Sequence, residues 1–77
     1  PNPAAAQAKI AYKAPSEGIF YWKLINSQGQ LIRSSQQNVT KDAYYVIELG
    51  SFELLNKGNY YLVYQNGSDA GTITIIK

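Results

Sequence analysis

The side chains that could do chemistry in this chain are few. The sequence has 77 residues and contains no histidine, no cysteine and no methionine. Without histidine or cysteine, the usual nucleophile–base pairs are not available. Thiol chemistry, disulfide bonds and imidazole ligands for a metal are excluded for the same reason. We therefore expect a protein that is not an enzyme and that needs no cofactor.

Carboxylates are the remaining candidates for a catalytic pair or a calcium site: Asp42, Glu48, Glu53 and Asp69. Their spacing does not match a calcium-binding loop. Asp69 lies in "NGSDAG", a turn-forming stretch in which aspartate usually stabilises the turn itself. We therefore expect no metal site.

Charge and aromatic content limit the remaining binding functions. The formal net charge is +2, and the seven lysine and arginine residues are scattered, so we expect no nucleic-acid binding. A carbohydrate-binding module would need a planar row of exposed aromatic side chains, for which the candidates are Tyr21, Tyr44, Tyr45 and Tyr61. This function and that of an Ig-like adhesion or spacer domain both stay open at this point.

Strands must position these side chains, because the apolar residues alternate with a period of two. The period predicts one buried and one exposed face for residues 8–14 and 43–49. The residues expected to face inward are Ala8, Ile10, Tyr12, Ala14, Tyr45, Ile47 and Leu49. Lys9, Lys13 and Glu48 are expected to face outward.

Residues 19–35 carry the clearest hairpin pattern. A loop of Ser27, Gln28 and Gly29, with Gly29 in the left-handed conformation, pairs Asn26 with Gln30. The same register pairs Leu24 with Ile32 and Trp22 with Ser34. The predicted core face of this hairpin comprises Phe20, Trp22, Leu24 and Ile32. The opposite face carries Tyr21, Ile25 and Leu31.

The closing residues 59–77 predict a second hairpin. With a loop of residues 67–70, Tyr64 lies opposite Ile73, Leu62 opposite Ile75 and Tyr60 opposite Lys77; Ile73 and Ile75 are then buried. Two apolar faces predict a pair that is central in its sheet or covered by a partner. Residues 50–58 form a corner with room for one short helical turn, in which Gly58 has a positive φ.

Short strands at close spacing predict an all-β fold, an Ig-like antiparallel β-sandwich of six or seven strands. A dimer or tetramer of hairpins is the weaker alternative. We assign residues 1–6 to the end of a linker and residues 7–77 to a single domain. The opening "PNPAAAQ" without an initiator methionine suggests a piece of a longer protein. No apolar run approaches the ~20 residues that cross a bilayer as a helix.

Five segments in order carry a resemblance to a known family: "PNPA", "KLINSQGQLIRS", "VIEL", "LLNKGNYYLVY" and "GTITIIK". Together they resemble the type A C-terminal sorting domain of the type IX secretion system of Bacteroidetes. The chain departs from that pattern in its longer "GSFELLNKG" and in the threonines near the start of the last strand, where a lysine is common. The residues that match the motifs, and so become candidates for recognition, are Pro3, Gly29, Gly58, Tyr60, Leu62, Tyr64 and Lys77.

The resemblance implies a non-catalytic signal at the C-terminal side of a cargo protein. The implied partners are the translocon and the cell-surface sortase. The implied route leads from the periplasm across the outer membrane, after which the cargo is attached to the surface or released. Weak self-association through an exposed β edge is also expected. Five apolar residues either line the sandwich interior or form an exposed docking patch: Tyr21, Ile25, Leu31, Tyr61 and Ile76.

Overall fold

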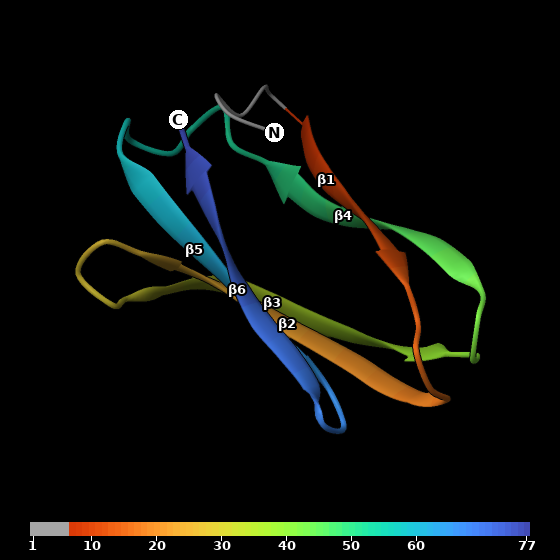
Figure 1. Ribbon diagram of the computed structural model, residues 1–77. Coiled ribbons are helices and arrows are strands. Elements are labelled where there is room, and N and C mark those ends of the chain that lie inside the picture. The colour runs from red at the N-terminus through yellow and green to blue at the C-terminus, as the bar shows by residue number, and fades with distance from the viewer. Residues whose placement is uncertain (1–6) are drawn as a thin grey trace.

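The computed structural model describes residues 7–77, which form strands and turns without any helix (Figure 1). The strands are β1 (Gln7–Lys13), β2 (Gly18–Asn26), β3 (Leu31–Val39), β4 (Tyr44–Ser51), β5 (Asn59–Asn66) and β6 (Asp69–Ile76). The predicted all-β fold is confirmed, with six strands. The predicted linker 1–6, with Pro3, lies outside the described residues. No helix in the described part is long and apolar enough to cross a membrane.

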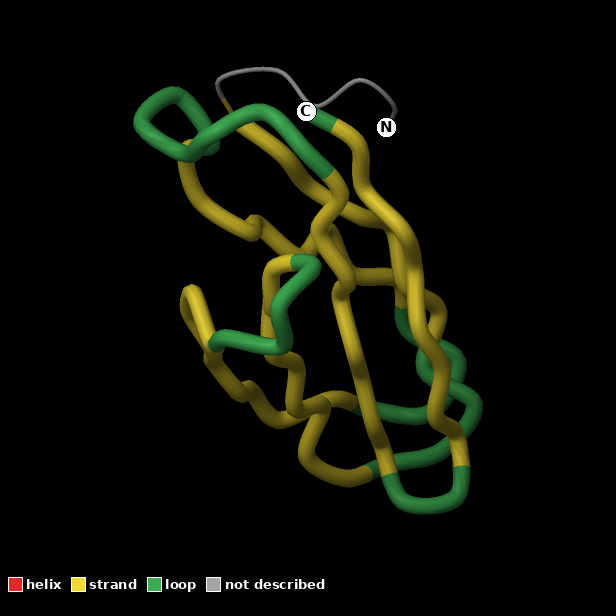
Figure 2. The backbone as a smooth tube through the Cα atoms, turned by 90° about the vertical axis from the view of Figure 1, so that its left-hand side faces the viewer, coloured by secondary structure: helices red, strands yellow, loops and turns green. Residues whose placement is uncertain are grey.

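The strands form two antiparallel sheets that face one another (Figures 1 and 2). One sheet contains β1 and β4, and the other has the order β3-β2-β5-β6. The core lies between them and is made of Ala8, Ala14, Phe20, Trp22, Leu24, Val39, Ile47, Leu49, Phe52, Tyr60, Leu62 and Ile75. This sandwich arrangement is consistent with the predicted Ig-like fold.

The two-stranded sheet follows its predicted alternation. Ala8, Ile47 and Leu49 are buried, and the partly buried Ile10, Tyr12 and Tyr45 pack against the core. Lys9, Lys13 and Glu48 are exposed, as expected. The period of two was sufficient here because each strand has one face on the core and one in solvent.

The β2–β3 hairpin has the predicted loop and a different register. Gly29 has φ 81°, and the Asn26 amide donates to the Gln30 carbonyl oxygen at 3.0 Å. Beyond the loop, Leu24 pairs with Arg33 rather than Ile32, and Trp22 with Ser35 rather than Ser34. A β-bulge is the cause, because Ile25 pairs with Leu31 and one extra residue, Ile32, is accommodated on β3. Ile32 packs against the core, as predicted.

The predicted register of the β5–β6 hairpin is wrong by two residues. Asn66 pairs with Asp69, so that Leu62 lies opposite Ile73, Tyr60 opposite Ile75 and Tyr64 opposite Gly71. The turn has only two central residues, and Gly67 at the first of them has φ 60°, as the type II′ turn favoured in hairpins requires. A shift of two residues leaves every side chain on its expected face.

The position of β6 also differs from the prediction. β5 is central, between β2 and β6, whereas β6 lies at the edge of the sheet. Ile75 is buried, but Ile73 is 37% exposed, because an edge strand is covered incompletely by the smaller facing sheet. The segment between β4 and β5 contains no helix but has a hydrogen-bonded turn, in which the Leu55 amide donates to the Phe52 carbonyl oxygen at 3.1 Å. Gly58 has the predicted positive φ, 149°.

Candidate recognition site

The last residue of the chain holds the corner between β4 and β5 in place. The backbone of Lys77 pairs with that of Gly58, with N–O distances of 3.0 and 3.3 Å, which extends the β5–β6 ladder. The Lys77 side-chain Nζ donates to the carbonyl oxygens of Glu53 at 2.9 Å and Leu55 at 2.5 Å. Lys77 is therefore a fixed structural contact rather than a solvated end.

The three sequence candidates on β5 all face the interior. Tyr60 is 5% exposed, and its hydroxyl donates to the Asn56 carbonyl oxygen at 2.6 Å. Leu62 is fully buried. Tyr64 is half-buried, and its ring centroid lies 5.9 Å from that of Phe20. A buried side chain can influence a partner only through the shape that it supports.

The two candidate glycines serve the backbone. Gly29 and Gly58 both have positive φ, and an added Cβ would meet no atom within 4 Å at either position. Conformation, rather than space, therefore requires glycine there.

Gly71 on β6 has a steric role that sequence reasoning missed. An added Cβ would lie 2.5 Å from the Tyr64 hydroxyl oxygen and 2.7 Å from Cζ of the same ring. The tyrosine therefore covers the strand backbone where a side chain would otherwise be. A glycine inside a predicted strand is the sequence signal for such a close approach.

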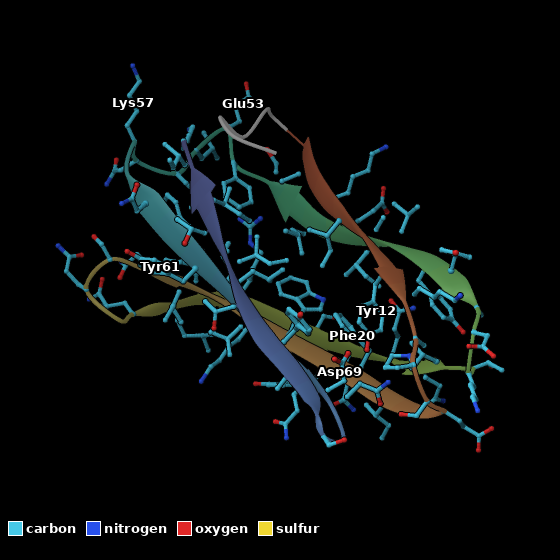
Figure 3. All side chains as sticks on the ribbon, viewed as in Figure 1. Tyr12, Phe20, Glu53, Lys57, Tyr61 and Asp69 are labelled. Carbon is cyan, nitrogen blue, oxygen red and sulfur yellow. The ribbon has the colours of Figure 1, made fainter. Side chains whose placement is uncertain are left out.

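A polar network joins β1 to the β5–β6 turn. The Tyr12 hydroxyl donates to Asp69 Oδ2 at 2.6 Å, and the buried Asn66 donates through Nδ2 to the Ser16 carbonyl oxygen at 3.0 Å and to the Tyr12 hydroxyl at 3.4 Å. Burial and then the hydrogen bond to Asp69 raise the pKa of Tyr12 above its ordinary 10.0. Figure 3 shows Tyr12, Phe20 and Asp69 together at this end of the sandwich.

This network also assigns a role to Asp69, considered above for calcium. Its carboxylate accepts a hydrogen bond from a side chain 57 positions away. Within residues 7–77 no group of three or more acidic residues is placed to hold a metal ion. Nothing in the local sequence indicates such a distant partner.

Arg33, on β3, connects the four-stranded sheet to β4 of the two-stranded sheet. Its Nη1 donates to the carbonyl oxygens of Leu49 at 2.9 Å and Ser51 at 2.8 Å, and its Cζ lies 5.8 Å from the Phe52 ring centroid. Gly50, with φ 88°, leaves room for the guanidinium, since an added Cβ would lie 2.6 Å from Nη1. Sequence reasoning missed this contact. The bulge turns Arg33 inward, and the alternation of apolar and polar residues does not predict a bulge.

The apolar residues whose location was left open lie outside the sandwich. Ile25 pairs with Leu31 on one side and Tyr61 on the other, all on the face of the four-stranded sheet turned away from β1 and β4. Leu31 is 60% and Ile76 46% exposed. Figure 3 shows Tyr61 on the side of the sheet away from β1 and β4.

The aromatic residues considered for carbohydrate binding do not form a row. Tyr21 and Tyr61 lie on the outer side of the four-stranded sheet, whereas Tyr44, on β4, is 77% exposed on the other sheet. Tyr45 packs against the core, and its hydroxyl accepts a hydrogen bond from the Thr40 amide at 2.8 Å. The planar platform that a carbohydrate module needs is therefore not assembled from these four.

Comparison with known proteins identifies one family. The model of the family described as "Secretion system C-terminal sorting domain" matches residues 1–77. No curated protein and no solved structure matches the chain.

Proposed function

We propose a mode of action for this chain, which belongs to the family of secretion system C-terminal sorting domains. A domain of this family is a C-terminal sorting signal for type IX secretion, and the chain has this role for the protein that carries it. Such domains are not known as catalysts. Export leads across the outer membrane to the cell surface or the extracellular space.

We propose that the protein carrying this domain takes the export route of the family. The cargo lies on the N-terminal side of the domain, crosses the periplasm, and is handed to the type IX translocon. A cell-surface sortase then removes the domain, and the cargo is attached or released. The domain contributes no reactive group to these steps; its folded shape is what the machinery recognises.

The contacts of the C-terminal hairpin support recognition of a folded shape. Ile75 is buried at 1% exposure, and Lys77 bonds to three residues of the preceding corner through its backbone and its ammonium group. Burial of an isoleucine side chain contributes roughly 1.5–3 kcal/mol to the stability of a fold. The last strand is therefore packed into the domain as part of its fold.

The motif residues act through this shape. In the proposal, Gly29 and Gly58 set the turns, Tyr60, Leu62 and Tyr64 hold β5 in the core, and Lys77 fixes the corner. Pro3 belongs to the entry segment, where the sortase would need an accessible backbone. We also expect weak self-association through the outer edge of β3, which has no neighbouring strand within residues 7–77. Sedimentation velocity at increasing concentration measures it.

Export of a fused reporter tests the proposal. A periplasmic reporter carrying the chain at its C-terminus, expressed in a type IX-competent host, should appear outside the cells. Truncation after Gly71 removes Ile73, Ile75 and Lys77 and should leave the reporter in the periplasm. A matched control replaces the exposed Val46 by serine and should be exported normally. Normal export of the truncated fusion would contradict the proposed role of the terminal strand.

A further inference from the structure

The outer side of the four-stranded sheet, called here the outer face, combines apolar side chains with a single positive charge. Its apolar part is centred on Leu31, Ile25 and Tyr61, which stand side by side on β3, β2 and β5. Ile76 and Tyr21 extend it, at 46% and 40% exposure. Leu31 is 60% exposed, whereas Ile25 and Tyr61 are half-buried. Apolar side chains gathered on one exposed face commonly mark an interaction site.

Lys23 is the one charged residue of the outer face among residues 7–77. It pairs in register with Ser34 and Val63, and no described carboxylate forms an ion pair with it. The outer side of the two-stranded sheet is different. There Lys9 stands opposite Glu48, and the Lys13 ammonium lies 5.4 Å from the Tyr44 ring centroid. Lys23 therefore has neither a cross-strand carboxylate like the one opposite Lys9 nor a recorded ring contact like that of Lys13.

A groove on the outer face places this charge beside apolar and polar groups. It measures about 400 Å³ and is lined by Tyr21, Lys23, Val63, Gln65, Ala70 and Thr72. The small side chains at the start of β6 leave the space. The ammonium, an amide and a hydroxyl are polar groups that can orient an occupant, while Tyr21 and Val63 supply apolar contact.

We propose that the outer face docks a protein segment of the export machinery that carries apolar side chains and a carboxylate. The carboxylate pairs with Lys23 in the groove, and the apolar side chains cover Leu31, Ile25 and Tyr61. This inference rests on the proposed function and names the surface through which it operates. Charge complementarity selects the occupant, because an approaching acidic group supplies the counter-charge that the face lacks.

Charge also argues against a second copy of the chain as the occupant. A two-fold contact brings the same surface of both copies together. Neither copy could then supply a counter-charge to Lys23 of the other, because the described residues of the outer face include no carboxylate. An acidic polysaccharide would satisfy Lys23, but the described aromatic side chains form no row on which successive sugars could stack.

Two matched double variants test the surface. The first, Lys23→Gln with Leu31→Ser, removes the charge and an exposed apolar side chain from the outer face. The control, Lys9→Gln with Val46→Ser, likewise removes a lysine and an exposed apolar side chain from the other sheet, where Val46 is 64% exposed against 60% for Leu31. Binding of each purified chain to the detergent-solubilised type IX outer-membrane complex is measured by biolayer interferometry, and export is measured with the fused reporter.

We expect about tenfold weaker binding and reduced export for the outer-face variant, and wild-type values for the control. Added salt should weaken wild-type binding, and Lys23→Arg should retain it. Circular dichroism checks that both variants are folded. If the wild-type fusion is exported and the outer-face variant binds and is exported equally well, the inference is overturned while the proposed function stands. A wild-type fusion that is not exported refutes the proposed function and this inference with it.

A second copy of the chain or an acidic polysaccharide on the outer face would give different experimental results. Self-association would appear as a concentration-dependent sedimentation coefficient of the free chain that the outer-face variant abolishes. Polysaccharide binding would appear as a fluorescence change on titration with a polyuronic acid, lost in Lys23→Gln. Either result, combined with unchanged binding to the outer-membrane complex, overturns the inference.

Discussion

Replacing Arg33 by methionine should destabilise the sandwich more than any other single change of a basic residue. The substitution removes the guanidinium. It leaves no large cavity, because methionine keeps an unbranched apolar side chain beside Phe52. It deprives the carbonyl oxygens of Leu49 and Ser51 of the donor that joins β3 to β4. The effect therefore reports on the link between the two sheets.

The magnitude follows from the two lost hydrogen bonds. A hydrogen bond to a charged group contributes about 1.5–3 kcal/mol. Here both bonds come from one nitrogen of a side chain that is only half-buried, so solvent competes, and we expect about 2–3 kcal/mol in total. For a chain of this length, the total free energy of unfolding is about 4–12 kcal/mol. The loss is thus a substantial fraction of the whole.

Urea unfolding followed by tryptophan fluorescence measures the effect. Trp22 is the single tryptophan and is 5% exposed, so its emission should report the loss of the core. Lys23→Met is the matched control, because Lys23 lies on the neighbouring strand without an ion-pair partner among the described residues; it should change the free energy by less than about 0.5 kcal/mol. If Arg33→Met differs from this control by less than that amount, the link between the sheets is not energetically important.

Three further predictions concern the C-terminal hairpin and its contacts. Tyr12→Phe removes the hydrogen bond to Asp69 and should destabilise the protein below pH 10. Because the pKa of Tyr12 is raised in the folded state, the difference in stability from wild type should shrink as the pH rises further. Urea titrations in which the variant and wild type show the same pH dependence would contradict this. Lys77→Met should cost about 1 kcal/mol and accelerate amide hydrogen exchange in the corner before β5, and unaltered exchange would count against the anchor. Gly71→Ala should cost about 1–3 kcal/mol by displacing Tyr64, and clearly less in a Tyr64→Leu background; equal costs in both would refute the steric argument.

Alternation in the sequence was enough to predict the faces of β1, β2, β4 and β5, because each of these strands has a buried and an exposed side. It did not predict the faces of β3, where the bulge turns Arg33 inward and residues 34–38 are all exposed. It was not enough to predict registers. The β2–β3 register depends on one extra residue at Ile32, which the contacts of Arg33 with the facing sheet make favourable. The β5–β6 register depends on a choice between two turn lengths that share the glycine Gly67. The two turn lengths preserve the hydrophobic pattern of β5 and β6, so that pattern does not distinguish them. The bulge shifts the pairing of β3 by one residue and brings Arg33 rather than Ile32 opposite Leu24, which apolar alternation gives no reason to expect.

The candidate site was predicted in a similarly uneven way. The conformations of Gly29 and Gly58 followed from turn chemistry, which is local. The network around Asp69 and the sheet order did not, because they bring together residues that are far apart in the chain. The edge position of β6 is a further case, since nothing in its apolar composition shows that β5 has β2 as its other neighbour.

The same long-range assembly bears on how an export signal of this kind is read. Ile25, Tyr61 and Ile76 come from three strands, and they become neighbours only when β2, β5 and β6 have paired in their native registers. Lys23 faces the groove by virtue of the same pairing. An unfolded chain contains all of these residues but presents no such surface. If the machinery docks on the outer face, recognition therefore depends on folding, and a domain that lacks its last strand is rejected because the surface is incomplete rather than because a short sequence is missing.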